Sequence, residues 1–398
     1  MKVLHITRQD TGGAGLCAYR ICKSLQSSDV DCKMLVLDKS RSDEFICAPF
    51  VVWNKFYRII HRLLRILNIY IFEYDILTKQ TIESKASFTS PVRNINILNH
   101  PWVKEADIIH LHQVDNFFNQ PDFLKKINKP VVWTIHDENF FYGTAHYHDC
   151  VYENDELEKK YRKIKIDMVA NKKNIGIVLL SNYFMQRFGT DPILKGKQVR
   201  VINNSVDCSK FIAYDKKIAR TKLGLNNIDI FLVFVAANIS DPFKGLQNLI
   251  NAVKEINIEE IKILAIGDNS SFVKNSIVLD VGKIYDIYKL SLYLSASDYF
   301  VMPSLQEAFS QAPLEAMACG KAAIVTPVSG VEEIINDNNG VICGGFSKYD
   351  LMEGIKIAMT KKYDSQLIRA DIESRFSPER ISAQYLSFYK SMLQCQAK

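Results

Sequence analysis

Two glutamates, Glu307 and Glu315, lie eight positions apart in a segment with the features of a ligand-binding turn. A strand is expected to end at Met302 and a helix to begin near Phe309. Because a helix turns once in about 3.6 residues, Glu315 should lie about two turns along, on nearly the same face as Glu307. Open α/β sheets bind ligands where strands end, and free N–H groups at a helix start attract phosphate. One carboxylate could contact a sugar and the other a ribose, although the spacing alone also fits two unrelated surface acids.

The elements that would position these residues alternate between short apolar strands and helices, and the pattern starts again half-way along the chain. The runs are apolar on both faces, as expected for parallel strands covered by helices. The sequence therefore predicts an α/β fold of two Rossmann-like, doubly wound domains that face each other across a cleft. We expect a first domain over residues 1–204 and a second over 205–377, with a helix at about 378–398 that returns to the first. Expected strands are 2–7, 32–37, 107–111, 130–135, 175–181, 199–203, 230–236, 261–266, 277–281, 299–302, 322–325 and 340–343.

Composition excludes several classes of protein. The 398 residues are 47% hydrophobic and 24% charged, which is typical of a folded globular protein. Fifty Lys and Arg against 44 Asp and Glu leave a net charge of only +6, with no dense basic patch, so we expect no nucleic-acid partner. The nine cysteines form no C-x-x-C pair and suggest a reducing compartment. No apolar run is long enough to cross a membrane, so we expect a cytoplasmic protein.

Residues 45–72 interrupt the α/β pattern. They contain no acidic residue, and aromatic and aliphatic side chains alternate with basic ones such as Arg58, Arg62 and Arg65. This composition suits an amphipathic helix that lies on an anionic membrane. The protein would then be peripheral on the inner face of the cytoplasmic membrane. It fits an ordinary helix with solvated basic residues equally well.

The segment around Glu307 and Glu315 resembles the E-x7-E signature of glycosyltransferase family 4, a group of retaining enzymes with the GT-B fold. The resemblance covers most of the chain, and the other matching segments are 11–15 (TGGAG), 106–112 (ADIIHLH), 134–137 (TIHD), 201–207 (VINNSVD), 244–245 (KG), 267–268 (GD) and 330–333 (GVEE).

The resemblance implies a role for each matching residue of the second domain. Glu307 would lie by the donor sugar and Glu315 would contact the ribose, while Lys244 would neutralise the leaving diphosphate. Further donor-binding residues implied by the resemblance are Phe309, Ser310 and Gln311 through their amides, and Lys283 and Ile284 beside the base. This sequence departs from the family at Asn238, which stands where an arginine is usual, so one of the two diphosphate cations is absent or supplied elsewhere.

In the first domain, the loop that contains Gly13 and Gly15 would let backbone approach the donor phosphate, or would only pack the helix closely. His136 would lie beside the donor sugar or acceptor, as the family's histidine does. His110 and His112 could line the cleft or be structural. Residues 146–150 (HYHDC) lack the second ligand pair of a zinc site, so we expect no metal there.

The predicted activity is a retaining transfer of a hexose-type sugar from a UDP- or GDP-sugar, without cofactor or metal. The resemblance implies that the leaving diphosphate itself deprotonates the acceptor hydroxyl. The acceptor would be a saccharide, lipid-linked through polyprenyl diphosphate, in capsule, O-antigen or exopolysaccharide (polysaccharide) assembly. The alternatives are a GT-B nucleotide-sugar epimerase and a non-catalytic nucleotide-sugar-binding protein.

Overall fold

The computed structural model describes residues 1–48, 76–77, 79, 81, 87–93, 95–150, 155–268 and 276–396. The predicted membrane helix at 45–72 lies, from residue 49 onward, outside the described residues. The chain divides into two compact units, each described by itself below. The N-terminal unit comprises Met1–Asn203 and Ile381–Lys398, and the C-terminal unit comprises Asn204–Arg380.

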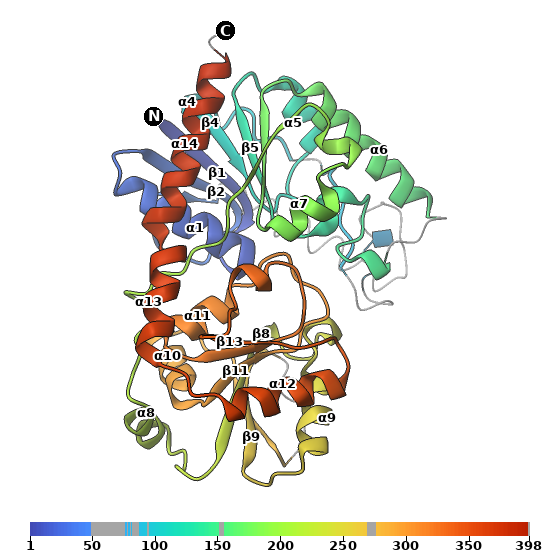
Figure 1. Cartoon of the computed structure of the whole chain (residues 1–398). Coiled ribbons are helices and arrows are strands. Elements are labelled where there is room, and N and C mark those ends of the chain that lie inside the picture. Colours follow the sequence, from blue (N-terminus) through green and yellow to red (C-terminus); the bar gives the residue numbers. More distant parts are fainter. Residues whose placement is uncertain are drawn as a thin grey trace, which may run out of the picture. The chain divides into compact units, whose positions relative to one another are not determined.

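The N-terminal unit is a parallel sheet covered by helices on both faces (Figure 1). Its strand order is β3-β2-β1-β4-β5-β6-β7, so the direction of winding reverses between β1 and β4. The strands are β1 (Lys2–Gln9), β2 (Asp31–Asp38), β3 (Ile46–Cys47), β4 (Ile108–Leu111), β5 (Val131–Ile135), β6 (Ile175–Leu179) and β7 (Gln198–Val201). The helices are α1 (Gly12–Gln26), α4 (Pro101–Glu105), α5 (Gln120–Lys126), α6 (Glu156–Asn171), α7 (Asn182–Phe188) and α14 (Pro378–Gln396).

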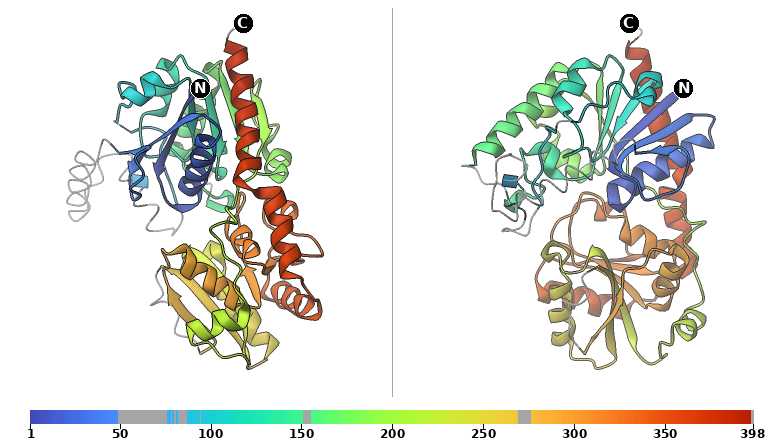
Figure 2. Two further views of the ribbon diagram at one scale, coloured as in Figure 1. Left: turned by 90° about the vertical axis from the view of Figure 1, so that its left-hand side faces the viewer. Right: turned by 180° about the vertical axis from the view of Figure 1, so that it is seen from behind.

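Helix α14 completes the core of the N-terminal unit. It runs beside α1, and the Ser24 and Ser382 hydroxyls are 2.8 Å apart (Figure 2). A Cβ added at Gly176 of β6 would come 2.5 Å from the Phe388 ring, so the helix packs directly on the strand. The α14 side chains buried in this core are Ile381, Tyr385, Phe388, Tyr389 and Met392.

The C-terminal unit is a second parallel sheet of order β10-β9-β8-β11-β12-β13, and here the winding reverses between β8 and β11. Its strands are β8 (Ile230–Asn238), β9 (Ile261–Asp268), β10 (Val278–Gly282), β11 (Tyr299–Met302), β12 (Ala322–Val325) and β13 (Gly340–Ile342). Its helices are α8 (Lys216–Leu223), α9 (Leu246–Ile256), α10 (Ile287–Ala296), α11 (Ala312–Ala318), α12 (Lys348–Thr360) and α13 (Ser365–Phe376). The prediction of two doubly wound α/β units is thus confirmed.

Two details differ from the sequence-based expectation. The short edge strand β3 was not predicted. Helix α11 begins at Ala312 rather than near Phe309, and Pro313 lies in its first turn. A helix that began at Phe309 would need an N–H from residue 313 for its first interior hydrogen bonds, and proline has none.

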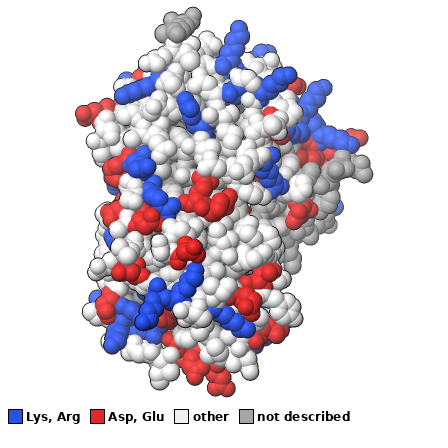
Figure 3. Space-filling model, viewed as in Figure 1, with Lys and Arg blue, Asp and Glu red and all other residues white. Residues whose placement is uncertain are grey.

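The surface drawn in Figure 3 carries both signs of charge. Lys and Arg are interspersed with Asp and Glu among the described residues of that face, which forms no continuous basic surface there. In the described part of the chain, no helix combines the length and apolar character needed to cross a bilayer.

Candidate functional site

The E-x7-E segment lies at the point where the C-terminal sheet reverses its winding. Strand β8 leads into a turn with a 3-10 helix (Pro242–Lys244), and β11 leads into the loop that carries Glu307. Because β8 and β11 are parallel neighbours, both loops leave the same edge of the sheet. This is the position at which open α/β sheets bind ligands.

Lys244 and Glu307 form an ion pair across this edge. The Lys244 ammonium donates to Glu307 Oε1 at 2.7 Å, and the Ser304 hydroxyl donates to the same oxygen at 2.9 Å. Burial lowers the pKa of Lys244, but the Glu307 carboxylate and then Asp241 raise it by more, so its pKa lies above the usual value. The lysine therefore stays charged and is fixed next to the carboxylate, as the two expected roles require.

A glycine allows the two loops to approach closely. Gly245 has a φ of +75°, and a Cβ there would come 2.0 Å from the Pro303 carbonyl oxygen. The Leu305 amide also donates to the Phe243 carbonyl at 2.8 Å. The Lys-Gly dipeptide therefore places the Lys244 side chain next to Glu307 as well as supplying its charge.

Three polar residues that sequence reasoning missed hold the loop after β11. The Asn204 amide donates to the Phe309 carbonyl at 3.0 Å, and the Ser329 hydroxyl donates to the Ala308 carbonyl at 2.9 Å. The Thr326 hydroxyl donates to the Ser304 carbonyl. Asn204 lies within the matching segment 201–207, and Ser329 lies just before the segment 330–333. Their place in or next to these segments was the only signal in the sequence that could have pointed to them.

The remaining expected donor-site residues lie along the same edge. Phe309 is buried and its ring packs near Phe376, so only its backbone is available to a ligand. Ser310 and Gln311 lead directly into α11, and Glu315 lies in the first turn of that helix, half-buried. The structure brings these residues to one loop and one helix turn.

Two strand ends further along this edge complete the expected donor site. The Asn238 side chain ends β8 and accepts hydrogen bonds from the Ser240 amide and hydroxyl, at 3.0 and 2.7 Å. Lys283 follows β10 and pairs with Asp268 at 2.6 Å, with Ile284 beside it. Asn238 thus stabilises a turn, and the Lys283 charge is already balanced by a carboxylate.

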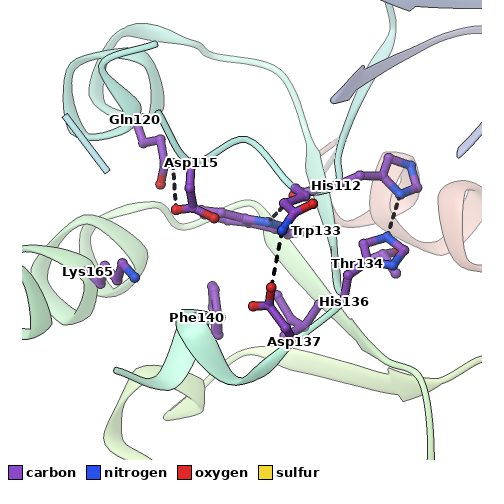
Figure 4. Close-up of a pocket in the computed structure, with 11 residues that line it drawn as sticks. His112, Asp115, Gln120, Trp133, Thr134, His136, Asp137, Phe140 and Lys165 are labelled. Carbon is purple, nitrogen blue, oxygen red and sulfur yellow. Dashed lines mark hydrogen bonds between the residues drawn. The ribbon is translucent and has the colours of Figure 1, made fainter. Parts of the chain in front are cut away.

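In the N-terminal unit, a pocket lies where β4 and β5 end, again next to the reversal of winding (Figure 4). His136 and Asp137 follow β5 and line the pocket together with His112, Asp115 and Lys165. His112 Nδ1 and His136 Nε2 are 3.0 Å apart. The structure therefore brings His136 and His112 together, as neighbours on one sheet edge.

Behind His136 the imidazoles continue into the core. His5 Nδ1 lies 2.8 Å from His112 Nε2, whereas both nitrogens of the fully buried His110 contact hydroxyls, those of Tyr389 at 2.6 Å and Thr134 at 2.8 Å. Burial lowers the pKa of His5 to about 3 and that of His136 to about 4, and it places the pKa values of His110 and His112 well below the usual range. These side chains are neutral imidazoles.

Another histidine of this pocket region, His146, forms an ion pair with Asp137. His146 Nδ1 lies 2.7 Å from Asp137 Oδ2, and His146 Nε2 lies 2.9 Å from the Thr89 hydroxyl. Burial alone would raise the pKa of Asp137 and lower that of His146, but the ion pair outweighs it and shifts both in the opposite direction. The loop before His146 is fixed by the buried Glu158 carboxylate, which accepts from the amides of residues 143–145 and from the Thr144 hydroxyl.

The Gly-rich loop follows β1 and opens α1. A Cβ at Gly15 would overlap the Gln9 carbonyl oxygen, so this glycine is needed for close packing of the helix on the strand. Nothing lies within 4 Å of a Cβ built at Gly13, which leaves space beside its backbone.

Residues 230–360, which span β8 to α12, match the family model described as glycosyl transferases group 1. The C-terminal unit therefore resembles the group 1 glycosyltransferases over these residues. The match includes Lys244, Glu307 and Glu315, so the ion pair lies within the part of the chain that resembles this family.

Curated relatives agree with this resemblance. The chain is 26% identical over 213 residues to N-acetyl-alpha-D-glucosaminyl L-malate synthase of Bacillus anthracis, covering 50% of this chain and 55% of that protein. It is 24% identical over 312 residues to protein CapJ of Staphylococcus aureus, covering 72% and 74%. The chain spans about half the length of the first curated relatives it matches.

Solved structures show that the fold is GT-B. Sucrose-phosphate synthase of Thermosynechococcus elongatus has a TM-score of 0.70 at 16% identity and covers 99% of this chain and 100% of that chain. Anabaena HepE in complex with UDP-glucose has a TM-score of 0.62 at 18% identity and covers 98% and 100%.

Proposed function

We propose that this chain is a group 1 glycosyltransferase that moves a hexose-type sugar from a UDP- or GDP-sugar to a saccharide acceptor, with retention at the anomeric carbon. The observation that carries the proposal is the Lys244–Glu307 pair, 2.7 Å apart where β8 and β11 end. It places a fixed cation and a carboxylate where the diphosphate and sugar of a donor would meet. The complex of HepE with UDP-glucose supports a nucleotide-sugar donor.

In this proposal the charges of the C-terminal unit bind and activate the donor. Lys244 and the backbone amides of residues 309–311 hold the diphosphate, and Glu315 accepts hydrogen bonds from the ribose. The base lies against Lys283 and Ile284, and Glu307 contacts the sugar. The proposal assigns no metal ion to the diphosphate, because Lys244 and the backbone amides donate to its oxygens.

The transfer step involves one bond broken and one formed on the same face of the sugar. The bond from the anomeric carbon to the β-phosphate oxygen breaks as the acceptor oxygen bonds to that carbon. The acceptor hydroxyl proton goes to the departing diphosphate. His136, a neutral imidazole at the end of β5, lies beside the acceptor and orients its hydroxyl groups.

Direct titration tests the donor site. UDP- and GDP-sugars are titrated calorimetrically into wild type and Glu315→Ala, with Glu373→Ala, an exposed glutamate of α13, as the control. A hydrogen bond to a charged group contributes about 1.5–3 kcal/mol, so Glu315→Ala should weaken one nucleotide class roughly 10- to 150-fold. Equal affinity of wild type and Glu315→Ala would contradict the ribose contact of Glu315. No binding of any nucleotide sugar to the wild type would contradict the proposed class of donor.

One observation favours a second candidate, a non-catalytic nucleotide-sugar-binding protein. Asn238 stands where the family's arginine would be and is bound to the Ser240 turn, and Lys283 is already paired with Asp268. Tight donor binding with no transfer to any acceptor would support this candidate. Donor turnover without an acceptor would instead support a nucleotide-sugar epimerase.

The acceptor is proposed to be lipid-linked and to belong to capsule, O-antigen or exopolysaccharide assembly. Similarity to CapJ and the basic, aromatic composition of residues 45–72 support this. Sedimentation with anionic liposomes, before and after replacement of Arg58, Arg62 and Arg65, tests the membrane contact. Binding that does not depend on these arginines, or no binding by the wild type, would contradict it.

A further inference from the structure

Within the described residues, five side chains capable of binding a metal converge in the N-terminal unit. Two overlapping groups share His112: His5, His110 and His112 form one, and Cys17, His112 and His136 form the other. In each group the potential ligand atoms lie within 4.8 Å of one another.

The first group is poorly suited to a metal. Both His110 nitrogens already have partners, the Tyr389 hydroxyl at 2.6 Å and the Thr134 hydroxyl at 2.8 Å. A metal on His110 would have to displace one of these buried hydroxyls. Loss of the hydrogen bond to the buried Tyr389 hydroxyl costs about 1–3 kcal/mol, whereas the Thr134 hydroxyl would keep its contact with the Tyr385 hydroxyl at 3.1 Å.

The second group has no such cost. His112 Nδ1 and His136 Nε2 are 3.0 Å apart, and in Figure 4 the two rings face each other from neighbouring strand ends. The Cys17 thiol, on α1, is buried and forms no hydrogen bond with the residues that the structure describes. Among the described residues, the one hydrogen bond that a metal would replace is that between the two imidazoles.

We propose that Cys17, His112 and His136 form a binding site for one divalent transition-metal ion of the Zn²⁺ type. One thiolate and two imidazoles are a ligand set that suits Zn²⁺, with bonds of about 2.3 Å to sulfur and 2.0–2.1 Å to nitrogen. The ion displaces the Cys17 thiol proton, which passes to solvent, and accepts lone pairs from two neutral imidazoles. The inference does not involve the proposed diphosphate site, but it shares His136 with the proposed sugar transfer, in which that residue orients the acceptor.

The surroundings of the ligands fit a metal site in two further respects. His5 Nδ1, 2.8 Å from His112 Nε2, accepts the proton of the non-ligating nitrogen and so fixes the orientation of the His112 ring. His136 is partly buried and lines the pocket beside Asp137. Three protein ligands therefore leave a fourth coordination position that a water molecule can fill from the pocket, as in zinc sites that are not purely structural.

The test uses the full-length protein, stripped with a chelator and titrated with Co²⁺ and then Zn²⁺. We expect one equivalent of metal per chain and a thiolate-to-cobalt charge-transfer band that Zn²⁺ abolishes. The band should disappear in Cys17→Ser and persist in Cys22→Ser, which alters another buried cysteine of the same helix. His5→Phe should weaken the affinity about 10- to 100-fold and keep the band.

A second variant covers the case in which Cys17→Ser does not fold. His136→Gln changes a partly buried ligand, and it should weaken Co²⁺ binding at least about 10-fold. A wild-type protein without the charge-transfer band, a band that persists in folded Cys17→Ser, or unchanged affinity in His136→Gln would each overturn the proposal.

Discussion

The Lys244–Glu307 pair is charge-balanced before any ligand binds. Each side chain is the partner of the other at 2.7 Å, and Glu307 is largely shielded from water. In the proposed donor site, an arriving diphosphate would compete with Glu307 for the lysine, so donor binding and the position of Glu307 would be coupled.

Replacement of Lys244 should impair transfer more than folding. Loss of one fixed group that stabilises a developing charge typically lowers kcat about 10²- to 10³-fold, and we expect that range for Lys244→Ala. Steady-state kinetics with the donor identified by titration measure the effect. Lys254→Ala, an exposed lysine of α9, should retain wild-type kcat, and equal activity of the two variants would contradict the role of Lys244.

The buried charge of a different lysine, Lys321, should destabilise the folded protein to an extent that depends on pH. Burial and then the nearby Lys216 lower the pKa of Lys321 to about 8, although its ammonium donates to the Ser297 carbonyl at 3.1 Å. Between about pH 8 and the unfolded value near 10.4, the unfolded chain binds more protons than the folded one, so stability rises with pH across this window. The cost of the buried charge is therefore present in full below pH 8.

We expect Lys321→Met to raise the free energy of unfolding by about 1–3 kcal/mol at pH 7, after loss of one hydrogen bond. The gain relative to wild type should shrink as the pH rises from 8 to 10. Urea unfolding at several pH values measures it, with Lys356→Met on the exposed face of α12 as the control. A gain that does not change with pH would show that the charge of Lys321 is not its cause.

Among the elements, the two loops at the reversal of the C-terminal sheet depend on one glycine. A residue with a side chain at position 245 would have to adopt a left-handed backbone and would also collide with Pro303. Gly224, the left-handed residue that ends α8, has a φ of +67° but nothing within 4 Å of a Cβ. These two glycines separate the conformational cost from the collision.

Gly224→Ala should cost about 1–2 kcal/mol, the cost of the left-handed backbone alone. Gly245→Ala should cost about 3–4 kcal/mol, because the loops must also move apart, and donor affinity should fall with it. Urea unfolding and donor titration measure the two effects. Similar stability of the two variants would mean that the contact with Pro303 relaxes without cost.

Most of the elements could be predicted from the sequence, because their strands are largely buried and appear as uninterrupted apolar runs such as 230–236 and 322–325. The strand β3 could not be predicted, because two residues are too few to show an alternation of apolar and polar side chains. The start of α11 depends on the missing N–H of Pro313 rather than on any apolar pattern. Glu307 and Lys244, 63 positions apart, were associated through family resemblance, because spacing in sequence carries no information on such a contact.

Residues whose role arises only in the folded chain were not predicted. Asn204 and Thr326 are ordinary polar residues until the fold places them against the loop after β11. His5 is part of an apolar strand and becomes notable only when β4 is paired beside it, with His112 just beyond the strand end. The expectation of no metal considered residues 146–150, which are close in sequence, and did not consider Cys17 with His136.

For the whole molecule, the division of the chain predicts how its parts fold when separated. The C-terminal unit, Asn204–Arg380, is continuous in sequence and has its own core of β8, α9, β9 and α12 side chains. The N-terminal unit is discontinuous, because Tyr385, Phe388 and Tyr389 of α14 belong to its core.

A fragment of residues 204–380 should therefore unfold cooperatively by itself, whereas a fragment of residues 1–203 should not. Removal of three buried aromatic side chains at about 3–5 kcal/mol each is as large as the whole usual stability of a domain. A peptide of residues 378–398 added to the 1–203 fragment should restore a cooperative transition, followed by circular dichroism. A stable 1–203 fragment that ignores the peptide would contradict this view of α14.

The late position of α14 also has a consequence for the order of events on the ribosome. Domains usually fold in the order in which they are synthesised. Here residues 204–380 are translated before the helix that closes the core of the N-terminal unit, so the second unit can finish folding while the first still exposes an apolar face. At about 5–20 residues per second, translation from residue 203 to Tyr389 leaves that face open for roughly 10–40 seconds, which is ample time for a chaperone to bind it.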